Sequence, residues 1–187
     1  MSLQQTGLLV LAGLLVFWCV GAYNRLVRLR SDVGRAFAAV ATQLLLRDGL
    51  LRQWAEAMEA FLEQTLNPNG DFLSACEQLR HAVERASPRP HVAGLIGELR
   101  STDEALAGAR TRLAAELPVH AHHISAVAAG LGASVMQVNE ELSACDTALA
   151  FAREQFNARV HCYNHALVQF PTVLMTGAFG FRAAGAL

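Results

Sequence analysis

Lysine is absent from this sequence, and all fifteen of its basic side chains other than histidine are arginines. Sixteen acidic residues bring the formal net charge to −1, so no positive field favours a nucleic acid partner. Only five prolines interrupt the 187 residues, and no alternation of polar and apolar residues indicates a β-strand. We therefore expect one all-helical domain with a sizeable core and no nucleic acid partner.

Motifs of catalysis and of disulfide scaffolds are also missing. The four cysteines (Cys19, Cys76, Cys145 and Cys162) are widely spread, with no Cys-x-x-Cys pair, which argues against a disulfide framework and suits a reducing compartment. No glycine-rich phosphate loop, nucleophile elbow or kinase motif occurs. The sequence predicts a protein that is not an enzyme and has no cofactor, metal or catalytic residue.

One long apolar stretch is present at the N-terminus. No charged residue occurs between Leu3 and Asn24, and about 20 apolar residues are enough to cross a bilayer. Trp18 and Tyr23 fall near one end, where amphipathic rings suit the lipid headgroups. We predict a transmembrane anchor over residues 1–24. The side chains expected to face lipid are Leu8, Leu9, Leu11, Leu14, Leu15, Phe17 and Trp18.

A cleaved signal peptide is the alternative, because Val20-Gly21-Ala22 resembles a cleavage site. Against it, Met1–Thr6 contains no basic residue, and the helical pattern continues past Ala22 without a breaker. Arginines follow the anchor at positions 25, 28, 30 and 35. The positive-inside rule then places the N-terminus outside and residues 25 onward in the cytoplasm.

Three proline-containing turns divide the remainder: Asn67–Gly70, Ser87–Pro90 and Leu117-Pro118. They predict four helices, at about 4–66, 71–86, 91–116 and 119–170. Ser101–Glu104 has the composition of a cap and could restart the third helix. The predicted fold is all-α: a transmembrane helix continuous with a long antiparallel, up-and-down four-helix bundle over residues 25–171, followed by an apolar tail over 172–187.

The first and last helices have hydrophobic residues every seven positions, as coiled-coil and bundle helices do. One row of the first helix is Leu26, Val33, Val40, Trp54 and Phe61, interrupted by Arg47; the adjacent row is Phe37, Leu44, Leu51 and Met58. The row of the last helix is Val135, Leu142, Leu149, Phe156, Tyr163 and Phe170.

Helix lengths predict an elongated shape. At 1.5 Å per residue, the first helix beyond the anchor and the last helix each run roughly 65–75 Å, and the middle helices roughly 25–40 Å. The part far from the membrane would be a four-helix bundle, and the part near the membrane a two-helix stalk. Two helices cannot bury both apolar rows, so we expect the stalk to self-associate or to bind a partner.

Short motifs near the two ends of the chain resemble those of the LemA family. They are Tyr23–Arg30, Gln43–Asp48, Asn139–Leu142, Ala150–Arg153, Phe156-Asn157, Tyr163-Asn164, Phe170-Pro171 and Phe179–Phe181. The sequence departs from the family pattern at 51–55 and at Phe156, where tyrosine is usual, and residues 71–134 show no match. The resemblance implies a helical protein of the bacterial inner membrane, in a family without an agreed biochemical activity.

The Tyr-Asn and Phe-Asn pairs are the strongest candidates for specific contacts. An asparagine on a packed helix face costs free energy unless it is hydrogen-bonded. We therefore predict that these pairs fix the pairing of the first and last helices; the alternative is that they are scattered polar residues. The apolar tail is expected at the membrane interface or against a second subunit. The predicted interaction residues of stalk and tail are Tyr23, Asn24, Phe156, Asn157, Tyr163, Asn164, Phe170, Pro171, Phe179 and Phe181.

Histidines form two clusters. His120, His122 and His123 are predicted at the start of the last helix, and His161 and His165 lie one turn apart further along it. An i, i+4 histidine pair can bind zinc, but a closed site needs four ligands, and no third ligand is evident here. We interpret both clusters as solvated or interface histidines.

These features suggest a non-enzymatic, membrane-anchored scaffold that self-associates through its stalk and tail. The expected partners are membrane lipid and further copies of the chain, with a membrane protein partner possible. The alternative is an adaptor that presents its distal bundle to a membrane protease or another membrane-bound partner.

Overall fold

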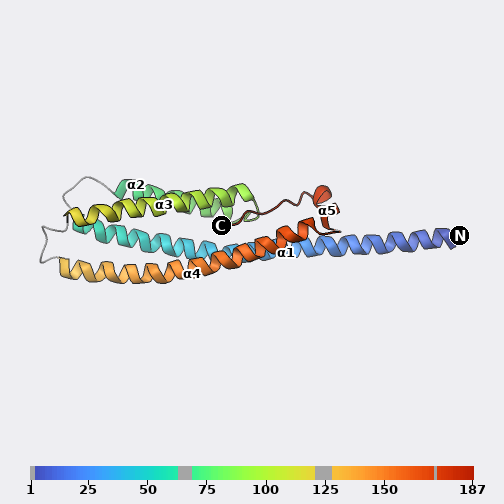
Figure 1. Ribbon diagram of the computed structural model, residues 1–187, viewed down its shortest axis with the longest axis horizontal. Helices are drawn as coiled ribbons and strands as arrows, with labels where there is room; N and C mark the ends of the chain where they lie inside the picture. The colour runs from blue at the N-terminus through green and yellow to red at the C-terminus, as the bar shows by residue number, and fades with distance from the viewer. Residues whose placement is uncertain (1–2, 63–68, 121–127, 171) are drawn as a thin grey trace.

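The computed structural model describes residues 3–62, 69–120, 128–170 and 172–187. They form five helices: α1 (Leu3–Leu62), α2 (Asn69–Ala86), α3 (Ala93–His120), α4 (Ala128–Val168) and α5 (Thr172–Phe179). No strand occurs in these ranges. Helices α1 to α4 run alternately up and down (Figure 1). The all-α, antiparallel bundle is confirmed, and α5 lies within the segment predicted as the tail.

Two of the predicted helix boundaries are wrong, and both concern α3. This helix continues through Pro118 to His120, so residues 119 and 120 belong to α3 and not to the last helix. Pro118 removes one backbone donor near the end of α3 without ending the helix there. The predicted restart at Ser101 is also wrong. The Ser101 and Thr102 hydroxyls donate to the Glu98 carbonyl one turn back, at 2.9 and 3.1 Å, so they serve the helix interior.

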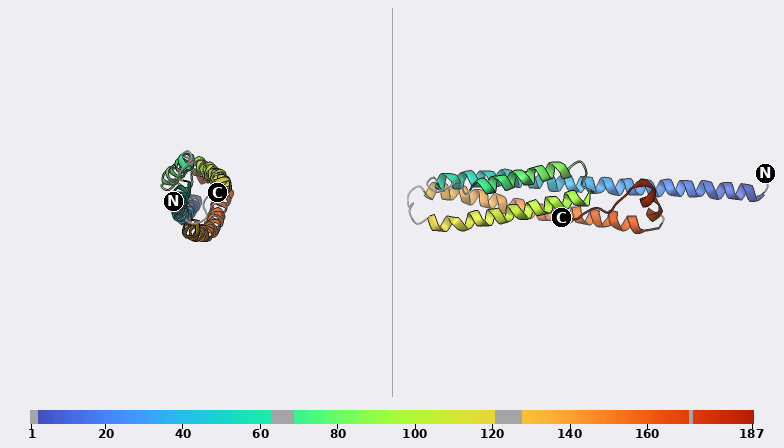
Figure 2. Two further views of the ribbon diagram at one scale, coloured as in Figure 1. Left: turned by 90° about the vertical axis from the view of Figure 1, so that its left-hand side faces the viewer. Right: turned by 90° about the horizontal axis from the view of Figure 1, so that it is seen from above.

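The long helices α1 and α4 pack together over most of α4, and α2 packs with α3 as a shorter pair beside them (Figures 1 and 2). Seen along the long axis, the four helices form a ring (Figure 2). On the side of the molecule where α1 starts, the α2–α3 pair ends first, and α1 and α4 continue beyond it (Figure 1). We call this part, residues 22–30 of α1 with 161–168 of α4, the stalk. Beyond α5, the start of α1 projects alone (Figure 1).

The predicted heptad rows form the core between α1 and α4. The buried members are Leu26, Val33, Phe37, Val40, Leu44, Leu51, Trp54, Leu142, Leu149, Phe156 and Tyr163. The Phe37 and Phe156 rings meet edge to face, with their centroids 5.6 Å apart. Phe170 departs from the pattern and is 73% exposed, because α4 has ended at Val168. The side chains of Met58, Phe61 and Val135 lie outside the described part of the structure.

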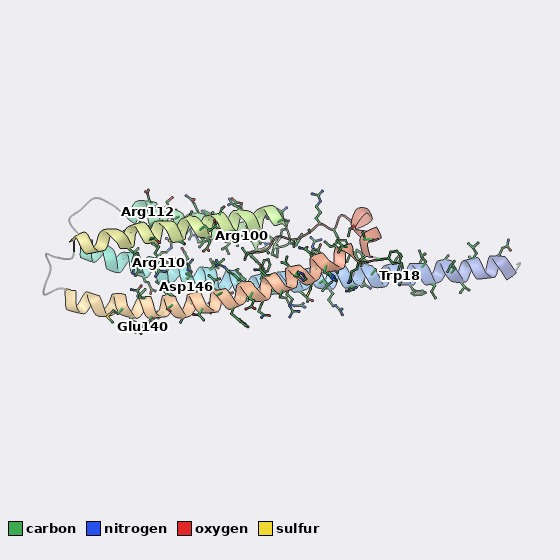
Figure 3. All side chains as sticks on the ribbon, in the orientation of Figure 1. Trp18, Arg100, Arg110, Arg112, Glu140 and Asp146 are labelled. Carbon is green, nitrogen blue, oxygen red and sulfur yellow. The ribbon has the colours of Figure 1, made fainter. Side chains whose placement is uncertain are left out.

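Arg47, which interrupts a heptad row, is buried and forms ion pairs there. Its Nη1 lies 2.9 Å from Asp103 of α3, and its Nε lies 2.7 Å from Asp146 of α4. Arg153 of α4 contacts the second oxygen of Asp103 at 2.7 Å, and Figure 3 shows Arg110 and Asp146 between α3 and α4. An unpaired buried guanidinium would cost several kcal/mol, so this network fixes the register of α1, α3 and α4.

Candidate functional site: the membrane-proximal junction

Among the described residues, α1 is the one helix long and apolar enough to cross a membrane, by length and composition. Many of its apolar side chains are exposed, namely Leu8, Leu9, Leu11, Leu14, Leu15 and Phe17, and Trp18 is partly exposed. Leaving one such side chain in water instead of an apolar medium costs roughly 1.5–3 kcal/mol. The described bundle does not cover this surface, as is expected of a membrane span and also of a signal sequence.

Three aromatic contacts join α1 to the segment that follows α4. The rings of Trp18 and Phe170 meet at a tilt of 56°, with their centroids 5.1 Å apart. Tyr23 contacts Phe179 at 5.2 Å and Phe181 at 5.9 Å. Each such pair contributes about 0.5–1.5 kcal/mol beyond its buried area. We call this meeting point of α1, the end of α4 and α5 the junction.

After α5 the chain reverses and runs back along the bundle. Gly180 makes the turn with φ of 68°, a conformation that glycine adopts without the steric cost of a Cβ atom. The following residues, 181–187, are called the tail segment below, and they pass from α5 towards the start of α3 (Figures 1 and 2). Phe181 and Ala184 are buried there, so the tail segment is part of the folded domain.

Two asparagines of α4 hold the tail segment through its backbone. The Asn164 amide donates to the Ala184 carbonyl at 2.9 Å and accepts from the Ala184 N–H at 2.8 Å. Asn157, two turns away, makes the same pair of bonds with Leu187, at 2.6 and 2.8 Å. Only an amide side chain offers both a donor and an acceptor in this geometry, which explains the residue type at both positions.

Helix α3 contacts the other side of the tail segment. Arg100 donates a hydrogen bond to the Ala186 carbonyl, and Figure 3 shows Arg100 on the side of α3 near the tail. A Cβ atom on Gly185 would lie only 3.0 Å from Ala93 Cα and 3.3 Å from Ile96 Cβ. A Cβ atom here would push α3 or the tail segment aside by a few tenths of an ångström, so glycine suits this close approach.

The structure changes the expected role of the asparagines. Asn157 and Asn164 bond the tail segment instead of α1, while Phe156 and Tyr163 are buried in the α1–α4 interface. Asn24 is exposed. The tail segment covers the stalk where the α2–α3 pair ends, a contact within one chain that sequence reasoning did not predict. The two asparagines bond backbone atoms of Ala184 and Leu187. A pattern of side chains in the sequence does not reveal such backbone partners. Pro171 lies outside the described residues.

Of the residues in the two histidine clusters, the structure describes only some. His120 is the last residue of α3 and not, as predicted, near the start of α4, and His122 and His123 lie outside the described residues. His161 and His165 are exposed, with parallel rings whose centroids are 6.3 Å apart. Within the part of the chain that the structure describes, no three His, Cys, Asp or Glu side chains are grouped to hold a metal ion.

The fold and the junction define an all-α protein in which one helix, long and apolar enough to span a membrane, continues into an antiparallel bundle. Residues 131–187 match the model of the LemA family. This match supports the resemblance to the LemA family over the C-terminal part of the chain. The motifs Tyr23–Arg30 and Gln43–Asp48 lie outside the matched residues. Searches among curated proteins and among solved structures find no match. The matched segment comprises nearly all of α4, with α5 and the tail segment, the unit that contains Asn157, Asn164 and their backbone partners.

Proposed function

We propose that this protein is a non-enzymatic scaffold of the bacterial inner membrane, anchored by the first part of α1 and self-associating at the junction. The anchor would place the N-terminus outside and the bundle in the cytoplasm, because the arginines at positions 25, 28, 30 and 35 follow the apolar stretch. Helix α1 is continuous from the apolar stretch into the bundle, so the bundle is held rigidly relative to the anchor.

One observation carries the proposed self-association: large apolar side chains remain exposed on the outer side of the junction. Val168 and Phe170 are 72% and 73% exposed, and Val173 and Phe179 of α5 are also exposed. The tail segment already binds α3 and α4 of its own chain. The surface that remains for a second copy is therefore the end of α4 together with α5. Contact between copies in the plane of the membrane would bury these side chains.

A matched pair of variants tests this surface. Phe170→Ser removes an apolar ring at the junction, and Phe151→Ser removes one of similar exposure, 64%, from the distal part of α4. With the full-length protein in nanodiscs, mass photometry should show oligomers for the wild type and Phe151→Ser, and monomers for Phe170→Ser. Oligomers of unchanged size in Phe170→Ser would overturn the proposed contact.

The adaptor function is favoured by a different observation. The distal bundle also exposes apolar side chains, namely Leu45, Leu46, Met136 and Phe151, and a membrane-bound partner could cover them. For the adaptor function, Phe151→Ser is the test variant and Phe170→Ser is its control. Phe151→Ser should lose a stoichiometric partner in pull-downs from membranes, while Phe170→Ser should keep it. Recovery of the same proteins with both variants would count against an adaptor.

A further inference from the structure

A cavity of about 550 Å³ lies where three parts of the chain meet: α1 of the stalk, the α2–α3 turn and the segment that leaves α5. Figure 1 shows the tail segment passing this turn. The apolar part of its lining comprises Tyr23, Val27, Gly34, Pro88, Pro90, Phe179 and Phe181. The polar part comprises Arg30, Ser31, Ser87 and His91. The cavity is thus amphiphilic, with aromatic rings of the junction as one wall.

The polar lining suits an anion. It contains no carboxylate, and among the described ion pairs none neutralises Arg30. One guanidinium N–H of Arg30 is in hydrogen-bond contact with His91 Nε2, and a guanidinium has five such donors in a planar arrangement that matches phosphate. The hydroxyl of Ser31 adds a neutral donor beside it. Arg30 is exposed, and a guanidinium without a described counter-charge favours a negatively charged ligand.

The position of the cavity indicates which anion. If the apolar stretch ends near Tyr23, then Arg30 lies about 10 Å further along α1. Headgroups occupy roughly the first 5–8 Å beyond the hydrocarbon, so Val27, about 6 Å along the helix, lies at their level. The Cα atom of Arg30 lies about 2–5 Å outside them, and its long side chain can extend back to a lipid phosphate. Phe179 and Tyr23 lie on its membrane side and could contact the first part of the acyl chains.

We propose that this cavity binds an anionic phospholipid, with its phosphate at Arg30 and Ser31 and its glycerol and upper acyl chains against Tyr23 and Phe179. The assignment to a lipid rests on the membrane anchoring proposed above. Binding is specific in this account: one phospholipid occupies one cavity, in addition to any general attraction of the stalk arginines for an anionic membrane surface.

The test distinguishes binding in the cavity from a general attraction of anionic lipid to the stalk arginines. Full-length protein in dodecyl maltoside is titrated with dioctanoyl phosphatidylglycerol, dioctanoyl phosphatidylcholine or inorganic phosphate, and occupancy is measured by native mass spectrometry. Arg30→Gln and Arg28→Gln remove the same charge from the same helix; both arginines are exposed, and of the two only Arg30 lines the cavity. We expect Arg30→Gln to weaken phosphatidylglycerol binding about tenfold or more and Arg28→Gln to change it less than about twofold.

A second variant blocks the cavity without changing charge. A Cβ atom on Gly34 would meet no atom within 4 Å, so Gly34→Leu has room, yet its side chain would compete with the ligand. Circular dichroism should show unchanged helix content while binding of phosphatidylglycerol is lost. Equal weakening by Arg28→Gln, equal affinity for phosphatidylcholine, or unaltered binding by Gly34→Leu would each overturn the proposal.

Inorganic phosphate distinguishes the source of the anion. If it occupies the cavity as tightly as phosphatidylglycerol does, the ligand is a free phosphate compound and the lipid assignment is wrong. Because these titrations are made in detergent, their failure leaves the anchor untouched. Failure of the anchor is detected separately, as extraction of the protein from membranes by alkaline carbonate.

Discussion

Replacing Asn164 by alanine should release the tail segment from α4. The substitution removes two hydrogen bonds, of 2.9 and 2.8 Å, between the Asn164 side chain and the backbone of Ala184. Each such bond contributes about 0.5–1.5 kcal/mol net, so the docked state should lose about 2 kcal/mol in total. This corresponds to roughly a 30-fold shift of the equilibrium between docked and released tail.

Hydrogen exchange of the tail amides measures this shift. The Leu187 N–H is bonded to Asn157 Oδ1, which Asn164→Ala leaves in place, so its protection factor reports release of the tail segment and should fall roughly 30-fold. The control is Asn139→Ala, because Asn139 is exposed on the same helix and its loss should leave the tail unchanged. Asn164→Asp keeps the acceptor and loses the donor, and should give an intermediate effect. If exchange at Leu187 is the same in Asn164→Ala and wild type, the tail is not held by the Asn164 side chain.

A substitution within the tail segment itself should also release it from the bundle. Gly185→Val would place a Cβ atom 3.0 Å from Ala93 Cα, so the tail segment must move away from α3. The amides of the tail segment should then exchange fast, although Asn157 and Asn164 are intact. Gly94→Ala is the control, since its Cβ atom would meet nothing within 4 Å. Slow exchange in Gly185→Val would show that the close approach to α3 does not occur.

Two further predictions concern titratable groups. Burial raises the pKa of the Cys76 thiol to about 12, so at pH 7 maleimide should label exposed Cys162 within minutes and Cys76 only after unfolding; fast labelling of Cys76 would contradict its burial. Burial and two neighbouring arginines lower the pKa of His91 below its ordinary 6.5. The folded protein therefore binds a proton at His91 less readily than the unfolded chain, so the free energy of unfolding should be unaffected by His91 above pH 6.5 and should fall as the pH drops below 6.5. His91→Gln should lose this part of the pH dependence of Tm, and an unchanged profile would refute it.

Much of the fold was predictable because it depends on repeated side-chain patterns. The heptad rows placed Leu26, Val33, Phe156 and Tyr163 in the α1–α4 core, where they are buried. A seven-residue period is a property of the sequence itself, and its consequence for helix packing is general. The apolar stretch before Asn24 was recognisable for the same reason.

The contacts that the sequence did not reveal depend on single pairings in space. Arg47 looked like an interruption of the apolar row, because its partners Asp103 and Asp146 are 56 and 99 residues away. Asparagine at 157 and 164 indicated hydrogen bonding, but the partners are backbone groups of a segment whose side chains are mostly small. Proline at 118 was weighted as a helix end, although α3 tolerates it near its last residue.

Size and symmetry of the full-length protein in nanodiscs, determined by electron microscopy, test the scaffold function most directly. The account predicts discrete oligomers in which the bundles project side by side from one face of the disc, with neighbouring chains in contact at the end of α4 and at α5. Single bundles, one per disc, at micromolar protein concentration would contradict it.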